Sequence, residues 1–260
     1  MNRTKKRQFI DLSLPIENSA MEGWPPRITR WDHREGARTH AKGIGVNPDE
    51  FPDGMCQAWE EITLISHAGT HVDAPWHFAP TSEGKPSKTI DECPLEWFYG
   101  PGFVLDVTKR KAGDLVTDDD VMKALADIDY EVSAGDIALL RTDAYKYAYD
   151  VNYTSAHPGI GRAATLYLLS LGVKLIGTDG YGYDKPFKIM GEEHKKGVPN
   201  ALWPGHYVGK EKEYCHIESL ANIDKIPIPF GFTVCAFPIL IDRASAGWCR
   251  AVAIIEGEES

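Results

Sequence analysis

Residues 66–78 read SHAGTHVDAPWHF, which places the imidazoles of His67, His71 and His77 and the carboxylate of Asp73 within eleven positions. This density of ligand-type side chains predicts a divalent metal site. A glycine and a proline interrupt any helix over the motif, so we expect the site on a strand and a loop. His71 and Asp73 are two residues apart and would share one face of an extended segment. Imidazoles with a carboxylate favour Zn²⁺ or Mn²⁺ over Ca²⁺ or Mg²⁺.

The stretch His67-Ala-Gly-Thr-His71-Val-Asp73-Ala-Pro-Trp-His77 resembles the signature of the cyclase family of metal-dependent hydrolases. That family includes bacterial kynurenine formamidases and isatin hydrolases. The resemblance to the formamidase branch implies that His67, His71 and Asp73 bind one metal and that Asp73 also bridges to a second. It further implies that His77 donates and accepts protons.

The same resemblance implies two more metal ligands near the C-terminus, a histidine and, twelve residues later, a glutamate. His206 and Glu218 match this offset. An alternative remains open, because His216 and Glu218 are two residues apart and would share a face of an extended segment. His216 could then join a single metal together with His71 and Asp73. We prefer His206 because of the matching offset, and we expect one or two ions.

Two segments are candidates for substrate selection. Trp24 precedes a proline in an early loop, a position that lines the substrate pocket in the resembled formamidases. Residues 28–54 are polar and lack periodicity, so we expect an extended loop or lid there. The chain is longer than typical formamidases, and the excess falls in residues 28–54 and 181–203. We therefore expect a reshaped pocket.

Hydrophobic segments recur from Phe9 to Ile255 without a linker or repeat, which predicts one domain over residues 1–260, with residues 1–8 as a flexible tail. Thr117 caps a helix that runs to Ile128, and a second helix over residues 161–171 precedes an apolar strand. These signals predict an α/β fold of mixed sheet and helices, and the resemblance implies the swivelling β/β/α fold of the cyclase family. Strands are expected at residues 9–14, 61–66, 103–107, 137–141, 173–178, 232–239 and 248–255.

The formal net charge of −10 disfavours nucleic acid or an anionic membrane as a partner, since both attract positive surfaces. No stretch approaches a membrane span, and no apolar signal region follows the basic residues at the start. The five cysteines form no CxxC pair, which is typical of free thiols in a reducing compartment. We therefore expect a cytoplasmic protein, and the family resemblance implies a homo-oligomer, either dimer or tetramer.

The predicted function is hydrolysis of an amide or ester of a small molecule, either a cyclic amide, an aryl formamide or a lactone. Bound metal would lower the pKa of a water molecule and polarise the scissile carbonyl, and His77 would transfer the proton. An arylformamidase acting on N-formylkynurenine is one alternative. A non-catalytic metal-binding module is another, although structural zinc sites are usually closed by cysteines, which this motif lacks.

Overall fold

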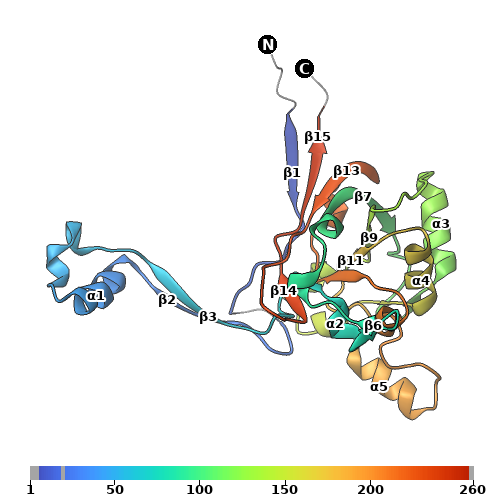
Figure 1. Cartoon of the computed structure of the whole chain (residues 1–260), viewed down its shortest axis with the longest axis horizontal. Helices are drawn as coiled ribbons and strands as arrows, with labels where there is room; N and C mark the ends of the chain where they lie inside the picture. Colours follow the sequence, from blue (N-terminus) through green and yellow to red (C-terminus); the bar gives the residue numbers. More distant parts are fainter. Residues whose placement is uncertain (1–5, 19–20, 258–260) are drawn as a thin grey trace.

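The structure, a computed structural model, describes residues 6–18 and 21–257 and is built on a nine-stranded mixed sheet (Figure 1). Four central strands are parallel, and antiparallel strands flank them on both sides. The α/β fold predicted from the sequence is confirmed. In spatial order the strands are β1 (Arg7–Asp11), β15 (Val252–Glu256), β13 (Phe230–Cys235), β7 (Tyr99–Asp106), β9 (Ile137–Arg141), β11 (Leu175–Thr178), β12 (Cys215–Glu218), β4 (His71–Asp73) and β14 (Ala246–Trp248).

Both faces of the central strands are buried. In β9, Ile137 and Leu139 pack into one hydrophobic core, whereas Ala138 and Leu140 pack into a second core on the opposite face. This arrangement follows from the alternation of side chains along a strand. It also explains why the strand reads as a continuous apolar run in the sequence, as parallel strands covered on both faces do.

Helices α3 (Asp118–Ile128) and α4 (Arg162–Ser170) cover the second core. Thr117 Oγ1 accepts a hydrogen bond from the Asp120 backbone N–H, so the predicted helix start is confirmed. Gly172 follows α4 with a φ of 93°, a conformation that stops a helix. None of the helices in the described part of the chain combines the length and apolar character that crossing a membrane requires.

Short elements connect the main strands and helices. They are α2 (Pro75–Phe78), β5 (Thr81–Ser82), β6 (Lys85–Pro86), η3 (Ile90–Glu92), η4 (Leu95–Phe98), β8 (Leu115–Val116), η5 (Ala144–Tyr147), η6 (Tyr153–Ser155), β10 (Gly159–Ile160), α5 (Phe187–Lys195), η7 (His206–Lys210) and η8 (Ile223–Lys225).

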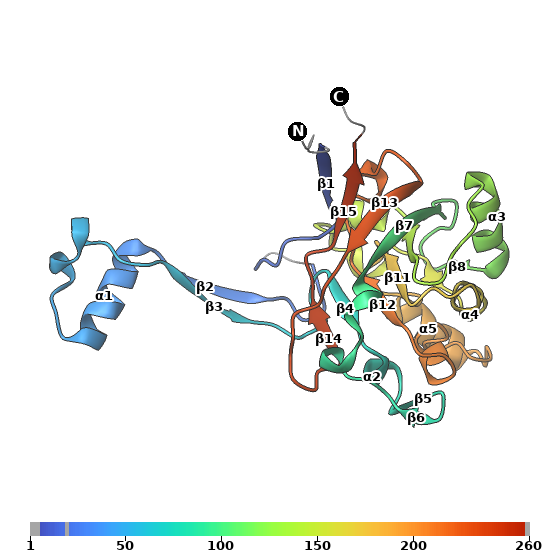
Figure 2. The same cartoon turned by 45° about the horizontal axis from the view of Figure 1, so that its top comes forward.

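Residues 27–63 form an arm that projects away from the sheet in both views (Figures 1 and 2). Its strands β2 (Arg27–Trp31) and β3 (Trp59–Thr63) pair in an antiparallel ribbon. Its tip holds α1 (His33–Ile44) and the turns η1 (Pro48–Glu50) and η2 (Pro52–Gly54).

The arm corrects the expectation of an extended loop or lid over residues 28–54. A capping box at Asp32 and Glu35 starts α1, and this local signal is present in the sequence. The buried face of this helix consists only of Gly36, Ala37 and Ala41. Because these residues are small, the sequence lacks the stripe of large apolar side chains from which a helix is usually predicted.

Other predicted strands differ from the structure at their ends, and the one expected over residues 9–14 is β1, which ends at Asp11. The strand expected over residues 61–66 is β3, which ends at Thr63. The one expected over 232–239 is β13, which ends at Cys235, and the next residue, Ala236, donates its backbone N–H to Phe98 at the end of η4. The one expected over 248–255 is split between β14 and β15.

The expected flexible tail is also shorter than residues 1–8. Arg7 and Gln8 belong to β1 and pair with Glu256 and Ile255 of β15. Residues 1–5 lie outside the described residues.

Substituting Phe103 in β7 tests the core. Phe103 is fully buried, so we expect Phe103→Ala to lower the free energy of unfolding by about 3–5 kcal/mol through lost burial and the cavity left behind. The matched control is Phe9→Ala in β1, whose side chain is 64% exposed and should change stability little. Urea unfolding of both variants measures the difference, and equal losses would contradict the assignment of the core.

Candidate metal centre

The site is centred where β4 pairs with β12. Asp73 lies opposite His216, and His71 lies opposite Glu218. Because directly paired side chains are neighbours on the same face, the four functional groups meet. His216 Nε2 lies 3.0 Å from Asp73 Oδ2 and 3.3 Å from Glu218 Oε1. The shared faces expected from the two-residue spacings are confirmed.

Two further imidazoles come from the segments on either side of β4. The chain turns at Gly69, with a φ of 60°, and this turn brings His67 Nδ1 to 2.7 Å from Asp73 Oδ1. After β4, Pro75 begins α2, a position that suits proline. That single helical turn holds His77 Nε2 3.7 Å from Asp73 Oδ2.

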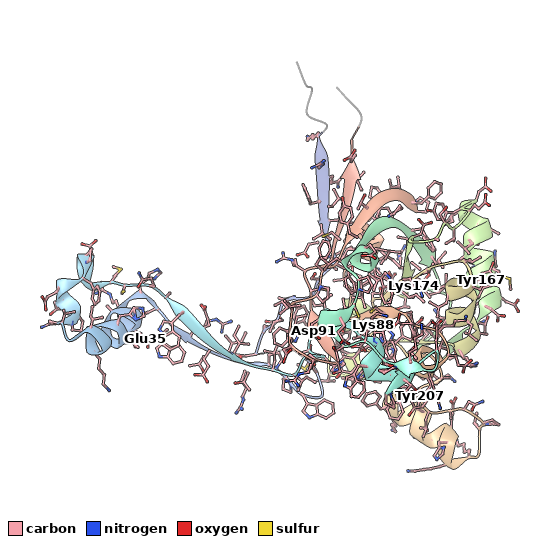
Figure 3. All side chains as sticks on the ribbon, in the orientation of Figure 1. Glu35, Lys88, Asp91, Tyr167, Lys174 and Tyr207 are labelled. Carbon is pink, nitrogen blue, oxygen red and sulfur yellow. The ribbon has the colours of Figure 1, made fainter. Side chains whose placement is uncertain are left out.

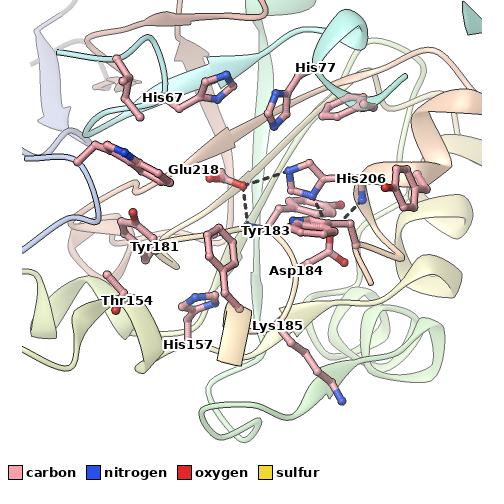
Figure 4. Close-up of a pocket in the computed structure, with 17 residues that line it drawn as sticks. His67, His77, Thr154, His157, Tyr181, Tyr183, Asp184, Lys185, His206 and Glu218 are labelled. Carbon is pink, nitrogen blue, oxygen red and sulfur yellow. Dashed lines mark hydrogen bonds and ion pairs between the residues drawn. The ribbon is translucent and has the colours of Figure 1, made fainter. Parts of the chain in front are cut away.

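The fifth imidazole, His206, begins η7 and lies beside Glu218, with its ring centroid 5.4 Å from that of His77 (Figure 4). Its Nε2 lies 3.8 Å from both Asp73 Oδ2 and Glu218 Oε1. The structure thus brings His206 and His216 together at the same two carboxylates. Their distances to these carboxylates are compatible with either imidazole as a metal ligand.

Two groups of side chains have the spacing needed to hold a metal ion. Asp73, His206, His216 and Glu218 each offer a ligand atom within 4.8 Å of the others. His67, Asp73 and His77 form the second group. Asp73 belongs to both groups: its Oδ1 lies nearest His67, and its Oδ2 faces His77, His206 and His216. His71 lies between them, with Nε2 3.2 Å from Asp73 Oδ1 and 3.8 Å from Glu218 Oε2.

The buried polar atoms at this point fit a cation. His71 Nε2 and Asp73 Oδ1 are buried 3.2 Å apart, and His67 Nδ1 lies 2.7 Å from Asp73 Oδ1, but neither buried atom makes a well-aligned hydrogen bond among the described residues. Leaving such atoms unsatisfied is costly. A divalent ion coordinated by both atoms would remove this cost. The donor set of imidazoles and carboxylates suits Zn²⁺ or Mn²⁺.

Without a metal, the neighbouring carboxylates hold protons on His71 and His216. Burial alone would lower the pKa of His71, but the charge and hydrogen bonding of Asp73 outweigh it and raise the pKa to about 9. Burial likewise opposes the effect of Asp73 and Glu218 on His216, whose pKa also rises to about 9. Burial raises the pKa of Glu218, but the His216 hydrogen bond reverses this and the pKa falls to about 2.

The cluster lies against a cavity of about 420 Å³ (Figure 4). His67, His77, His206 and Glu218 line one part of it, and aromatic residues line much of the rest. Trp24 lies on this wall, where the sequence placed it. The segment 181–203 contributes several wall residues, whereas the lining includes none of residues 28–54. The aromatic lining residues are Trp24, Phe78, Tyr181, Tyr183, Phe187, Trp203 and Tyr207.

Sequence reasoning missed Asp184. Its carboxylate accepts from the backbone N–H groups of Gly205 and His206, and it lies 2.6 Å from His206 Nδ1. The ring must therefore donate from Nδ1, which leaves Nε2 free to face Asp73 and Glu218. Only tertiary structure joins residues 184 and 206, so no local sequence signal could reveal the pair.

Two other polar residues near the site have structural partners. Asp179 is buried and accepts from the backbone N–H groups of Thr142 and Asp143, which directly follow β9. His157, which the sequence analysis did not single out, lines the cavity, and its Nδ1 lies 3.1 Å from the Pro158 carbonyl oxygen. Burial lowers the pKa of His157.

Cys215 is not placed as a nucleophile. It precedes His216 on β12, so its side chain points to the opposite face, where its Sγ lies 3.7 Å from Cys93 Sγ. Burial raises the pKa of the Cys215 thiol well above its usual value. A thiolate, the reactive form, is therefore disfavoured.

Comparison with known proteins agrees with this geometry. Residues 10–185 match the family model described as "Putative cyclase". The chain belongs to the cyclase family. Within this family, the chain is 30% identical over 220 residues to the isatin hydrolase of Roseibium aggregatum, covering 78% of this chain and 77% of that protein. It is 24% identical over 243 residues to the kynurenine formamidase of Erythrobacter litoralis, covering 89% and 96%.

Solved structures share the cyclase-family fold. An isatin hydrolase bound to the product analogue thioisatinate matches with a TM-score of 0.74 at 24% identity, covering 96% of this chain and 93% of that one. Isatin hydrolase A from Ralstonia solanacearum matches with a TM-score of 0.76 at 21% identity, covering 96% and 92%. These structures show the fold, whereas the family match over residues 10–185 and the 30% identity to an isatin hydrolase show a metal-dependent hydrolase, so the alternative of a non-catalytic metal-binding module is set aside.

The role of Asp184 in orienting His206 can be tested by Asp184→Asn. The Asn side chain can turn its NH2 group, a donor, towards Nδ1, which is also a donor, and the ring orientation is then no longer fixed. We therefore expect metal affinity to fall by about 10- to 100-fold. The control is Asp179→Asn, a buried carboxylate nearby in sequence that touches no candidate ligand. It should affect stability without weakening metal binding. Isothermal titration with Zn²⁺ and Mn²⁺ measures both, and equal affinities would contradict the positioning role.

Metal binding should release protons at neutral pH. His71 and His216 have pKa values raised to about 9, so both are largely protonated below that pH in the metal-free protein. An ion needs the unprotonated nitrogens, and its affinity should therefore fall as the pH is lowered. Titration in buffers of different ionisation enthalpy measures the protons released. A binding heat that does not depend on the buffer would contradict this prediction.

Proposed function

We propose that the protein hydrolyses the C–N bond of a small aromatic amide, with a cyclic amide as the first candidate. The observation that supports this most is the convergence of imidazoles and carboxylates against a cavity with aromatic walls. The volume of about 420 Å³ lies in the range of small-ligand pockets. The 30% identity to an isatin hydrolase favours the cyclic amide. An aryl formamide is the second candidate, and a lactone offers the same carbonyl.

The proposed cofactor is one or two ions of Zn²⁺ or Mn²⁺. The proposed ligands are His67, His71, Asp73, His206 and Glu218, with His216 as the alternative to His206. A bound ion would lower the pKa of a water molecule and polarise the substrate carbonyl. The shared position of Asp73 in both ligand groups supports two adjacent ions.

His77 is the proposed proton-transfer residue. Its side chain is one-third exposed and reaches the cavity, so a water or leaving group can approach it. Burial lowers its pKa to about 4, against the opposing charge of Asp73. His77 is therefore neutral at pH 7, which is the form that accepts a proton, while the lowered pKa makes it a weaker base and its protonated form a ready donor to the leaving nitrogen.

The aromatic walls suit a flat substrate. Trp24 is 62% exposed at the cavity, and Phe187 and Trp203 meet edge to face with ring centroids 5.9 Å apart. Aromatic side chains gain from stacking on an aryl ring as well as from burial. We propose that Trp24 contacts the substrate ring, while the carbonyl points at the imidazole cluster.

The proposed partner is therefore a small molecule, with neither nucleic acid nor a membrane surface involved. The acidic net charge of −10 supports this. We also propose a cytoplasmic location. All five cysteines are free, as expected in a reducing compartment.

Turnover of isatin and of N-formylkynurenine by the metal-loaded protein tests the proposed function. We expect isatin to be opened more efficiently, measured as kcat/KM by the loss of its absorbance. The opposite preference would favour arylformamidase activity. Absence of turnover on either compound and on simple lactones would contradict the proposal.

The role of His77 is tested by His77→Gln. We expect kcat to fall by about 10²–10⁴-fold while the metal content per chain stays unchanged. A fall in metal content would instead make His77 a ligand of the group that it forms with His67 and Asp73. Metal analysis and steady-state kinetics on the same sample distinguish these results.

The choice between His206 and His216 is tested by replacing each with alanine and counting metal ions. If His206 completes a second position, His206→Ala should reduce about two ions per chain to one. An unchanged content in His206→Ala together with a loss in His216→Ala would reverse the assignment.

A further inference from the structure

One buried imidazole of the cavity wall has no part in the proposed metal chemistry. His157 lies between η6 and β10, is 1% exposed and lines the cavity. It belongs to neither group of side chains that could hold an ion, and Figure 4 shows it across the cavity from His67 and His77. Ionisable groups buried at the wall of a pocket are candidates for substrate binding.

The contacts of this ring fix the nitrogen that carries its proton. Nδ1 of His157 lies 3.1 Å from the Pro158 carbonyl oxygen, and because a carbonyl oxygen can only accept, Nδ1 is the donor. Burial lowers the pKa of His157, so the ring is neutral at pH 7. The groups that act in the other direction are the carbonyl oxygens of Pro158 and Thr154 and the carboxylates of Glu218 and Asp184. A neutral ring with its proton on Nδ1 presents a lone pair at Nε2, which is therefore a hydrogen-bond acceptor.

The edge of the ring that carries Nε2 faces a glycine. A Cβ at Gly182 would lie 3.9 Å from Nε2 and 3.6 Å from Cε1 of His157, at ordinary contact distance. Gly182 lines the cavity as well, so the lack of a side chain there leaves this edge of the ring open to a ligand. The hydrogen bond to Pro158 uses the other nitrogen, and the described residues make no hydrogen bond to Nε2.

His157 lies at the inner wall of the cavity rather than at its mouth. The lining residues Trp24, Phe187 and Tyr207 are each more than half exposed and form the rim. Tyr207 lies on the side of the body that carries α5 (Figure 3). A substrate that enters past this rim brings its leading end to the buried imidazole.

The same inner wall reaches a candidate metal ligand. Gly182 precedes Tyr183, whose backbone N–H donates to Glu218 Oε1 at 2.7 Å. This short segment thus adjoins His157 at one residue and Glu218 at the next, and all of these residues line the cavity. One small molecule can therefore direct its carbonyl at the imidazole cluster and a substituent at Nε2 of His157.

We propose that His157 selects the substrate by accepting a hydrogen bond, through Nε2, from an N–H or O–H group remote from the scissile carbonyl. The inference rests on the proposed function and deepens it, because it names the substrate class as an aromatic amide with an amino or hydroxyl substituent. A methyl group at the same point would bury Nε2 without a partner, and leaving a buried acceptor unsatisfied is costly. A carboxylate there would meet the lone pair and is disfavoured as well.

The experiment compares isatins that carry either a hydroxyl or a methyl group at each free position of the aromatic ring. For the metal-loaded wild type we expect the hydroxyl compound to exceed its methyl partner in kcat/KM by about 10- to 100-fold at one position or more. This ratio should fall close to one in His157→Phe, whose ring lacks the nitrogens. The control is His194→Phe, the same change at an exposed residue of α5, which should keep the wild-type ratio.

A second variant, Gly182→Ala, covers Nε2 without removing His157. Gly182 is not among the glycines with a positive φ, and the added methyl group would meet the ring at ordinary contact distance, so the variant should fold. We expect it to reduce the preference for the hydroxyl compound as His157→Phe does. A preference that survives in both variants would overturn the proposal, and so would a wild type without any preference.

The protonation of the ring can be observed without turnover. NMR of protein with isotope-labelled histidine nitrogens, assigned by comparison with His157→Phe, should show a proton on Nδ1 of His157 and none on Nε2 at pH 7. A charged ring or a proton on Nε2 would overturn the proposal.

The same NMR signal separates this proposal from the proposed function. If no isatin is hydrolysed, the proposed cyclic-amide activity fails, and a titration then decides the role of His157. Hydroxyisatins should shift the Nε2 signal, whereas methylisatins should not. Absence of any shift would contradict the proposal.

Discussion

A buried carboxylate, Asp73, is the group on which the site depends. It is 1% exposed and lies on β4 between two neighbouring strands, where an unpaired negative charge would be very costly. Imidazoles surround it from the turn before β4, from the helical turn after it and from β12. Interaction with these imidazoles and with His71 lowers the pKa of Asp73 well below its usual value, although burial opposes this. The imidazoles that stabilise the Asp73 carboxylate are also the side chains that could bind a metal ion.

Much of this site could be predicted because its spacing is local. The offsets from His71 to Asp73 and from His216 to Glu218 are two residues each, and a strand needs only its own geometry to align them. The choice between His206 and His216 could not be predicted, because it depends on how η7 approaches β12. The role of Asp184 could not be predicted either, because its contact with His206 spans a loop whose path is set by tertiary packing.

The fold was predictable to a similar extent. The buried strand β9 and the capped helix α3 have strong local patterns, and the structure places them as expected. The arm was misjudged because sequence reasoning identifies elements by the apolar face that they bury. In residues 27–63 that face is either made of small residues or left exposed within one chain. The capping box at Asp32 is the remaining local sign of a helix in this segment. Capping residues are polar, so they do not stand out in a polar stretch.

The position of β4 in the sheet has a consequence for the order of events during synthesis. This strand enters the sheet between β12 and β14, which follow it by more than 140 residues in the chain. The histidine-rich motif therefore leaves the ribosome long before the strands that flank it exist. Until they arrive, it is a flexible segment of imidazoles without Glu218, able to bind metal ions only loosely. Stable loading of the ion is thus a late step, and a nascent chain cut before Glu218 should lack a metal centre.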